Sequence, residues 1–339
     1  MAAEPGVAAA PGSAPDPDPS VASPAAPPVQ PTAPPVQPAA PPVQPAAPPV
    51  QPAAPPVQPA AAAGAGRQRA ALPAGQCVAV SLLLLATLIL GFLGYLFGAS
   101  GIQEAGAQHR LYATLARELG QEIGPLGPTR PGAPVALISI PAIGLRSVVV
   151  VEGTSAEELT LGPGHLRSTP LPGQLGMSVI YGRRATFGAP FGHLNEVAPG
   201  DKITTITQQG ISVYRVVALG DSQHPVTDTT LNRLVLMTAN SPQVPAYYLE
   251  VDADLVTKVN NGPVELPDIG PAEQALAGDS GALVLTMVWG LALALVAVGG
   301  AAAAGRWSPW PVYLVVAPVA LAITWNLYEN LAALLPNLY

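Results

Sequence analysis

The stretch LVLMTANSPQ, from Leu234 to Gln243, contains the end of one apolar segment and the start of a loop. The apolar residues predict a β-strand, and Pro242 prevents a central strand from continuing because proline cannot donate a ladder hydrogen bond. A strand that ends in a loop is a common position for a catalytic side chain, since the strand fixes it and the loop exposes it. The residue at this strand end is Ala239, which has no reactive group. The sequence therefore predicts the support for a catalytic residue without the residue itself.

The region around this stretch, residues 132–256, is predicted to be one all-β domain. Its apolar runs are short, and clusters of Gly, Pro and Asp separate them. This spacing is typical of a compact barrel or sandwich, and about 125 residues are enough to bury one core. The runs are VALISI (135–140), SVVVVE (147–152), MSVIYG (177–182), KITTIT (202–207), SVYRVVAL (212–219), RLVLMT (233–238) and YYLEVDADL (247–255).

The composition of the chain excludes several kinds of function. Charged residues make up 10% of the chain, against about 25% in ordinary soluble domains. The net charge of −7 provides no basic surface for nucleic acid, so no nucleic-acid partner is expected. Cys77 is the single cysteine, and it lies at the edge of an apolar run, where a thiol usually behaves as a small hydrophobic residue. The β domain therefore contains no thiol.

Three long apolar segments predict membrane-spanning α-helices at residues 77–99, 282–305 and 310–336. Each is long enough to cross a hydrocarbon core of ~30 Å. Arg67 and Arg69 precede the first segment, and positive charge favours the cytoplasmic side of a membrane. We therefore expect a multi-pass cell-membrane protein whose N-terminus is cytoplasmic and whose β domain is extracytoplasmic.

The segments that flank the β domain have simpler patterns. Residues 102–124 place apolar side chains at helical spacing, which predicts a stalk helix that continues the first span. Residues 257–281 are rich in Pro and Gly and predict a linker to the second span. Residues 1–66 form a Pro/Ala-rich tail with five PPVQPAA-type repeats, which predicts disorder or polyproline II. This tail is interpreted as a spacer, and a ligand for a proline-recognition domain is the alternative.

Eight stretches of the β domain follow one another in the order and spacing of the actinobacterial sortases, most like class E. The stretches are ISIPAIGL (138–145), VVEGTSAEEL (150–159), GPGH (162–165), TPLPGQLG (169–176), VIYGRR (179–184), FGAPFGHL (187–194), PGDKI (199–203) and LVLMTAN (234–240). The domain therefore resembles a sortase over residues 133–256. The two C-terminal spans resemble those of a subgroup that carries extra membrane segments.

The resemblance implies an eight-stranded barrel with a cysteine, a histidine and an arginine at its active site. The cysteine thiolate would attack the Thr–Gly carbonyl of a Leu-Pro-X-Thr-Gly-like sorting signal, and the acyl group would pass to a cell-wall amine. The histidine would act as acid or base, and the arginine would stabilise the oxyanion.

This chain departs from the family at all three positions. The step that holds the histidine in the family is GRR here, which places Arg183 there, and guanidinium cannot serve as a base. The step that holds the cysteine is MTAN, which places Ala239 there. The position of the arginine is occupied by Tyr247 or Tyr248. The resemblance thus predicts a catalytically degenerate sortase, that is, a pseudoenzyme.

Other residues offer little replacement chemistry. Ser241 and Ser178 are the candidate hydroxyls, and His165, His193 and His224 are the candidate bases. An improvised pair would still need an oxyanion hole and an orienting third group. The histidines lack metal-ligand spacing, so neither a metal nor a cofactor is expected.

Some of the polar residues near the strand end are candidates for binding instead. They are Arg183, Arg184, Asn240, Tyr247 and Tyr248. The two guanidinium groups would suit a carboxylate or phosphate on a partner or wall polymer. The alternative is that Arg184 is an ordinary scaffold residue and Arg183 a surface residue.

The sequence as a whole favours a membrane-anchored, sortase-like protein that acts as a non-catalytic binding or assembly component at the outer face of the membrane or in the cell wall. Its expected partners are the lipid bilayer, a membrane or cell-wall protein, and a peptide that resembles a sorting signal. The alternative is an active, cysteine-independent hydrolase or transpeptidase that acts on such signals. A third interpretation places the function in the spans through Glu329, although its position near a span end favours the outer headgroup layer.

Overall fold

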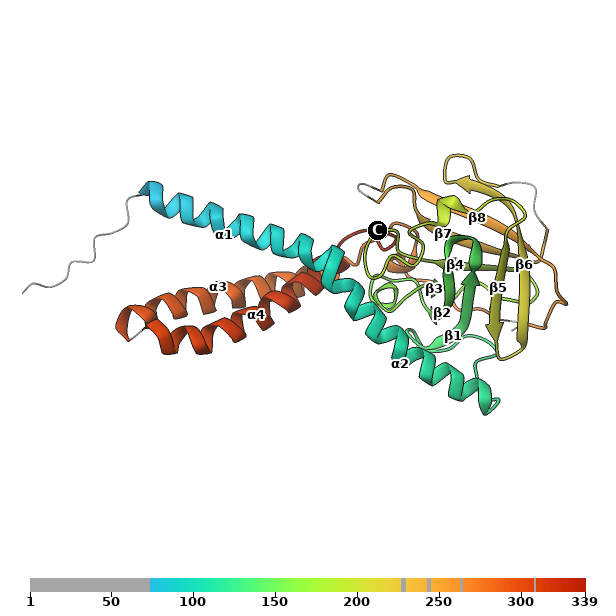
Figure 1. The fold of residues 1–339 in the computed structure, drawn as a ribbon, viewed down its shortest axis with the longest axis horizontal. Helices are drawn as coiled ribbons and strands as arrows, with labels where there is room; N and C mark the ends of the chain where they lie inside the picture. Colours follow the sequence, from blue (N-terminus) through green and yellow to red (C-terminus); the bar gives the residue numbers. More distant parts are fainter. Residues whose placement is uncertain (1–73, 227–229, 243–244, 263–264, 308) are drawn as a thin grey trace, which may run out of the picture. The chain divides into compact units, whose positions relative to one another are not determined.

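The computed structural model describes residues 74–339, except for residues 227–229, 243–244, 263–264 and 308. The predicted tail at 1–66 lies outside the described residues. Ala70–Tyr339 form one unit, whose helices and strands are labelled in Figure 1.

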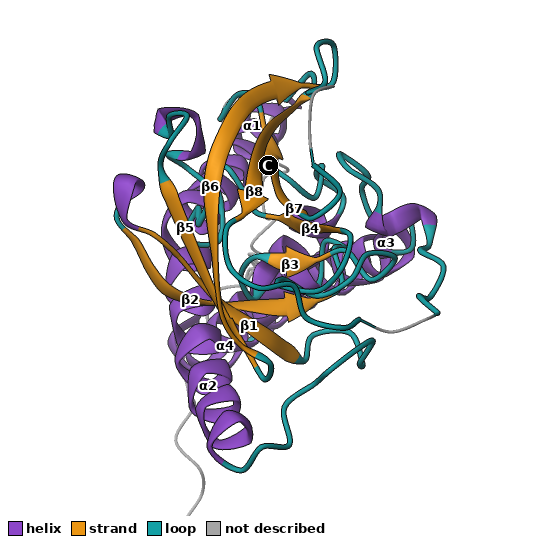
Figure 2. Ribbon diagram, turned by 90° about the vertical axis from the view of Figure 1, so that its right-hand side faces the viewer, coloured by secondary structure: helices purple, strands orange, loops and turns teal. Residues whose placement is uncertain are grey.

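The β domain is a closed barrel of eight strands in the order β1-β2-β3-β4-β7-β8-β6-β5, as expected from the resemblance. Figure 2 shows the strands wrapping around one another. Seven strands match the seven apolar runs of the sequence. The remaining strand, β3, contains two residues in the GPGH stretch and bridges β2 and β4. The strands are β1 (Pro134–Ile140), β2 (Leu145–Glu152), β3 (Gly164–His165), β4 (Met177–Tyr181), β5 (Lys202–Thr207), β6 (Gly210–Asp221), β7 (Arg233–Ala239) and β8 (Tyr248–Leu255).

Alternation along the strands separates the interior of the barrel from its outer surface. In β5, every second residue from Ile203 onward is buried, as the two-residue period of a strand requires. The interior is filled mainly by branched aliphatic side chains, among them Ile138, Ile180 and Leu236, all with 0% exposure. This core fixes which residues of each strand point outward.

The N-terminal helical region begins with α1 (Ala74–Gly94), passes through a π-helical turn (Tyr95–Ala99) and continues as α2 (Ser100–Gly120). The predicted stalk therefore continues the first span, but it ends at Gly120 and not at residue 124. The backbone at Glu122 has a φ of 58°, which takes the chain out of the helical conformation.

Gln108 is a polar side chain that fixes helix α2 to the barrel. Gln108 Nε2 donates to the carbonyls of Val149 (3.0 Å) and Leu161 (2.8 Å), and its Oε1 accepts from the Val149 amide (2.8 Å). This close approach requires Gly162, because a Cβ there would lie 2.1 Å from Gln108 Nε2. The GPGH stretch thus supplies both a strand and the contact surface for the helix.

Two further helices, α3 (Ala282–Arg306) and α4 (Pro309–Ala333), follow the barrel and pack against each other. Among the described residues, three helical segments are long and apolar enough to cross a membrane: Val78–Gly120, Ala282–Arg306 and Trp310–Ala333. This agrees with the three predicted spans. The last helix ends at Ala333, however, and not at residue 336 as predicted, because the chain turns at residue 334 toward the barrel.

Candidate functional site

The strand end predicted from LVLMTANSPQ lies on the outer surface of the barrel, where β4 and β7 run parallel. Val179 pairs with Val235, and Tyr181 pairs with Met237. The outward side chains of the two strands form a cluster separate from the barrel core. We call this cluster the floor, and it contains Val179, Tyr181, Val235, Met237 and Ala239.

Ala239 ends β7 on this floor, where the sequence predicted the support for a nucleophile. It is fully buried and pairs with Tyr248 across β8. Asn240 joins the two ends of the loop between β7 and β8, since its Oδ1 accepts from the amides of Ala246 (3.1 Å) and Tyr247 (3.2 Å). Its own amide donates to the Tyr247 carbonyl (3.0 Å). The side-chain oxygen of Asn240 thus shapes the loop, and Tyr248 packs beside the floor.

Arg183 follows β4 and is fully buried. Its Nε donates to the Leu159 carbonyl (3.2 Å), its Nη2 to the Ala156 carbonyl (3.0 Å) and its Nη1 to Thr186 Oγ1 (3.3 Å). The guanidinium carbon lies 4.7 Å from the centre of the Phe187 ring, within the range of a cation–π contact. Burial lowers the pKa of Arg183 to about 10, so the group stays charged at neutral pH.

The position of Arg183 corrects one interpretation of the sequence. The residue is not a drifted surface arginine, because its side chain is enclosed and binds the loop that contains the short helical turn Glu158–Thr160. Arg184 points elsewhere and donates from Nη2 to Asn195 Oδ1 (2.7 Å). Burial lowers the pKa of Arg184, with Glu196 acting in the opposite direction. The two arginines therefore do not form a shared anion site in this conformation.

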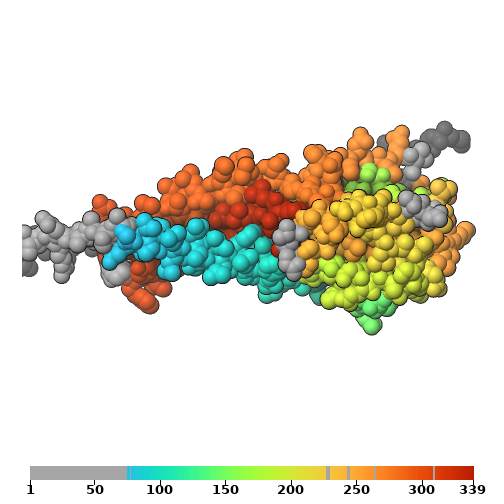
Figure 3. Space-filling view, turned by 90° about the horizontal axis from the view of Figure 1, so that it is seen from above, coloured from blue at the N-terminus to red at the C-terminus, as the bar shows by residue number. Residues whose placement is uncertain are grey.

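Residues 334–339, which we call the C-terminal segment, cover the floor. Leu338 has 0% exposure and belongs to the same cluster as Ala239 and Leu159. Its carbonyl accepts from the Arg184 amide (2.9 Å), and the Tyr339 carbonyl accepts from Thr186 Oγ1 (2.7 Å). The ring of Tyr339 lies 6.5 Å from that of Phe97, and Figure 3 shows these last residues in the darkest red beside the cyan helix.

Asn337 joins the C-terminal segment to two other parts of the chain. Its Nδ2 donates to the carbonyls of Thr154 (2.9 Å) and Gln274 (2.8 Å), and its amide donates to the Ala277 carbonyl (2.8 Å). The residue has 0% exposure. Asn337 therefore holds the C-terminal segment between the barrel and the linker that precedes α3.

The linker itself is attached to the barrel by an ion pair. Arg167 Nε and Nη2 donate to the two carboxylate oxygens of Glu273, each at 2.7 Å. Hydrogen bonding from Arg167 lowers the pKa of Glu273, and burial opposes this effect. Thr154 Oγ1 also donates to the Glu273 carbonyl (2.7 Å). The Arg167–Glu273 pair has the bidentate geometry that makes arginine–carboxylate pairs strong. The linker therefore has a fixed place beside the floor.

The candidate bases are engaged in structural contacts. His165 is buried, with Nδ1 at 3.0 Å from Glu152 Oε2 and Nε2 at 3.0 Å from the Pro170 carbonyl. His193 and His224 are exposed and lie beside Glu196 and Asp221. Ser178 is buried on β4. Among the described residues, no group of three or more His, Cys, Asp or Glu side chains is arranged to hold a metal ion.

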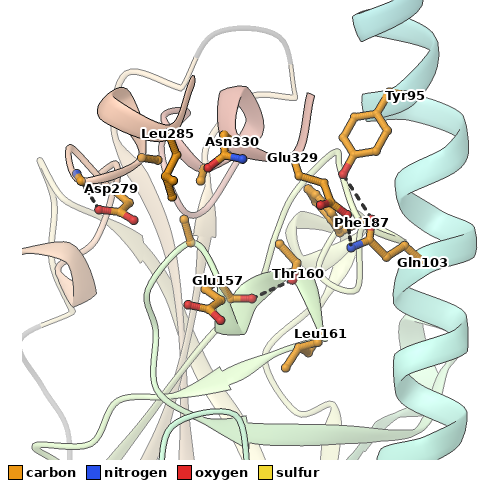
Figure 4. A pocket seen from close by; sticks show the side chains of 14 residues that line it. Tyr95, Gln103, Glu157, Thr160, Leu161, Phe187, Asp279, Leu285, Glu329 and Asn330 are labelled. Carbon is orange, nitrogen blue, oxygen red and sulfur yellow. Dashed lines mark hydrogen bonds between the residues drawn. The ribbon is translucent and has the colours of Figure 1, made fainter. Parts of the chain in front are cut away.

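A pocket of about 470 Å³ lies between the barrel and the helices (Figure 4). Glu329 lines it and accepts on Oε1 from Gln103 Nε2 (3.3 Å) and Trp325 Nε1 (2.9 Å). Its carboxylate therefore connects α4 to α2, at the end of α4 that faces the barrel. Other residues that line the pocket include Tyr95, Glu157, Thr160, Phe187, Asp279, Leu285 and Asn330.

Comparison with known proteins identifies the kind of barrel. Residues 138–248 match the family model described as a Sortase domain. Sortase D of Bacillus subtilis (strain 168) is 29% identical over 119 residues, which are 35% of this chain and 52% of that protein. The chain thus spans about half the length of the curated relative it matches. The family match and the closed eight-stranded barrel together show a sortase-like domain.

Two of the solved structures similar to this chain are described as sortases. A Sortase D5 transpeptidase of Clostridium perfringens has a TM-score of 0.40 and 21% identity, covering 45% of this chain and 99% of that one. Sortase E from Streptomyces avermitilis has a TM-score of 0.33 and 27% identity, covering 38% of this chain and 91% of that one.

Proposed function

We propose that this chain is a membrane-anchored, sortase-like protein that binds a partner at the outer face of the membrane or in the cell wall and does not catalyse transpeptidation. The observation that carries this proposal is the floor itself. The nucleophile position is Ala239, which is fully buried, and Leu338 belongs to the same apolar cluster. A methyl group cannot form an acyl intermediate, and Leu338 occupies the apolar cluster beside it in this conformation.

The other two family positions support the same proposal. Arg183, in the place of the histidine, donates to backbone carbonyls and has no role open to it as a base. Tyr248, in the place of the arginine, packs beside the floor. Tyr181, a floor residue, has a pKa raised by burial to about 12, so it is a neutral phenol at physiological pH.

The degenerate state, the likeness to class E and the actinobacterial origin are parts of this proposal, supported by the motifs of the sequence. The proposal also places the barrel outside the cytoplasm and residues 1–66 in the cytoplasm. The position of the arginines before the first span supports this orientation. Under this topology the chain connects a cytoplasmic Pro-rich tail, three spans and an outer binding domain. Such an arrangement suits an assembly component between the two sides of the membrane.

Affinity purification tests this proposal. The tagged full-length protein is crosslinked briefly in cells, extracted in mild detergent and analysed by mass spectrometry against a tag-only control. We expect one membrane or wall-facing protein in an amount comparable to the bait. Recovery of the bait without any protein enriched over the control would contradict an assembly role.

A further inference from the structure

The C-terminal segment, residues 334–339, is bound as a separate ligand would be. Donors at the edge of the floor hold its backbone, since the Arg184 amide binds the Leu338 carbonyl and Thr186 Oγ1 binds the Tyr339 carbonyl. One side chain, Leu338, is inserted into the apolar cluster of the floor. Backbone hydrogen bonds combined with side-chain pockets are how proteins bind extended peptides.

Two side chains of the C-terminal segment make contacts that depend on their residue type. Asn337 donates to carbonyls of Thr154 and Gln274, which an aliphatic side chain at that position could not do. Leu338 is buried in the same apolar cluster as Leu159 and Ala239. The site therefore fits an amide side chain followed by a branched apolar one.

Several features indicate that the C-terminal segment can leave the site. None of its residues is in a β-strand, so no ladder of hydrogen bonds anchors it. Leu334, Leu335, Pro336 and Tyr339 remain half-buried. Asn337 Oδ1 is buried without a hydrogen-bond partner among the described residues, and a buried unpaired oxygen is unfavourable. A segment of the same chain can also occupy the site through contacts that are individually weak, because its effective concentration at the site is in the millimolar range or above.

We propose that the floor on β4 and β7 is a binding site for an extended peptide with an Asn–Leu step, and that residues 334–339 occupy it as an internal ligand that such a peptide must displace. This inference rests on the proposed binding function. It adds the ligand class and the reason why the site is covered. Because α4 ends at Ala333, directly before the C-terminal segment, displacement would also change the contact of Tyr339 with Phe97.

Thiol labelling of the full-length protein tests the proposal. In a Cys77→Ala background, Ala239→Cys places the single thiol on the floor, and its rate of reaction with a maleimide reports how often the floor is uncovered. We expect slow labelling that becomes at least about tenfold faster with Asn337→Ala. The matched control is Asn326→Ala, which removes a side-chain amide that donates to the Ala322 carbonyl of its own helix. The peptide ALLPNLY should slow the labelling of the Asn337→Ala variant, and a scrambled peptide should not.

A disulfide provides a second test that does not depend on the stability of the Asn337→Ala variant. Ala239→Cys combined with Leu338→Cys should crosslink within one chain under mild oxidation. Crosslinked dimers on a gel would show that a second copy supplies the C-terminal segment, which overturns the internal-ligand proposal. Equal labelling rates for the Asn337→Ala and Asn326→Ala variants would also overturn it. The affinity purification described above decides the binding function separately, so the two can fail independently.

Discussion

Arg183 provides the sharpest test of how the site is built, because the resemblance places it where the family has a histidine, whereas its contacts are structural. The change is Arg183→Met, which keeps much of the length and removes all donors. Two buried carbonyls, those of Ala156 and Leu159, lose their donor, and Thr186 Oγ1 keeps its hydrogen bond to the Tyr339 carbonyl. Each unpaired buried group costs about 1–3 kcal/mol. Removal of a charge whose burial is itself unfavourable offsets part of this loss. The expected net destabilisation of the barrel is about 2–4 kcal/mol.

Hydrogen–deuterium exchange of the full-length protein in detergent measures this effect. Since 1.4 kcal/mol is about tenfold in an equilibrium constant, peptides from β4 and β7 should exchange roughly 30- to 700-fold faster in Arg183→Met. The matched control is Arg184→Met, which loses one hydrogen bond, to Asn195, and should change exchange by about tenfold or less. Equal effects of the two substitutions would refute the structural role of Arg183, as would unchanged exchange in Arg183→Met.

Three further predictions concern the barrel and its linker. Burial, aided by Glu250, raises the pKa of Asp252 to about 7. The folded state therefore binds a proton more readily than the unfolded chain, whose Asp pKa is about 4. The free energy of unfolding should consequently fall as pH rises from about 4 to 7. Asp252→Asn should flatten this slope in thermal denaturation, and an unchanged slope would be the contrary result. Arg167 lowers the pKa of Glu273 in the folded state. Glu273→Gln should therefore lower the free energy of unfolding by about 1 kcal/mol at pH values above about 4.3, the pKa of Glu in an unfolded chain. The difference from wild type should vanish as pH falls below that value. Exchange within residues 271–277 checks this, and equal protection in both proteins at pH 7 would count against it. Gly182→Ala places a Cβ 2.3 Å from the Phe191 ring and should cost about 1–3 kcal/mol by denaturant titration, whereas a neutral effect would mean that the ring moves freely.

The sequence was sufficient for the parts of the fold that depend on local pattern. Short apolar runs bounded by turn residues located seven of the eight strands, and long apolar runs located the three candidate spans. The remaining strand, β3, has two residues, which is too short to show a period. The end of α4 was misplaced because the apolar character of the chain continues through Leu335 while the helix does not.

The site was predictable only in its location. LVLMTANSPQ placed Ala239 at a strand end correctly, but the burial of Arg183 depends on a loop more than twenty residues earlier in the chain (24 residues to Leu159). The linker contact joins residues 106 apart, and the contact of Thr186 with Tyr339 joins residues 153 apart. Neither pair has a spacing that helix or strand periodicity can detect. The one local signal for the C-terminal segment was Asn337, a polar residue after a Leu-Leu-Pro step in an apolar region.

The absence of catalysis is tested most directly by incubating the full-length protein with a Leu-Pro-X-Thr-Gly peptide and an amine acceptor, with an active sortase as the positive control. Mass spectrometry then detects cleavage or transfer. The Asn337→Ala variant is measured in parallel, so that a covered floor cannot by itself explain a negative result. We expect no product from either protein, because Ala239 supplies no nucleophile. Product formation by the wild-type chain or by the Asn337→Ala variant would contradict the absence of catalysis. Loss of that product in Ser241→Ala or His165→Ala would identify the residue responsible.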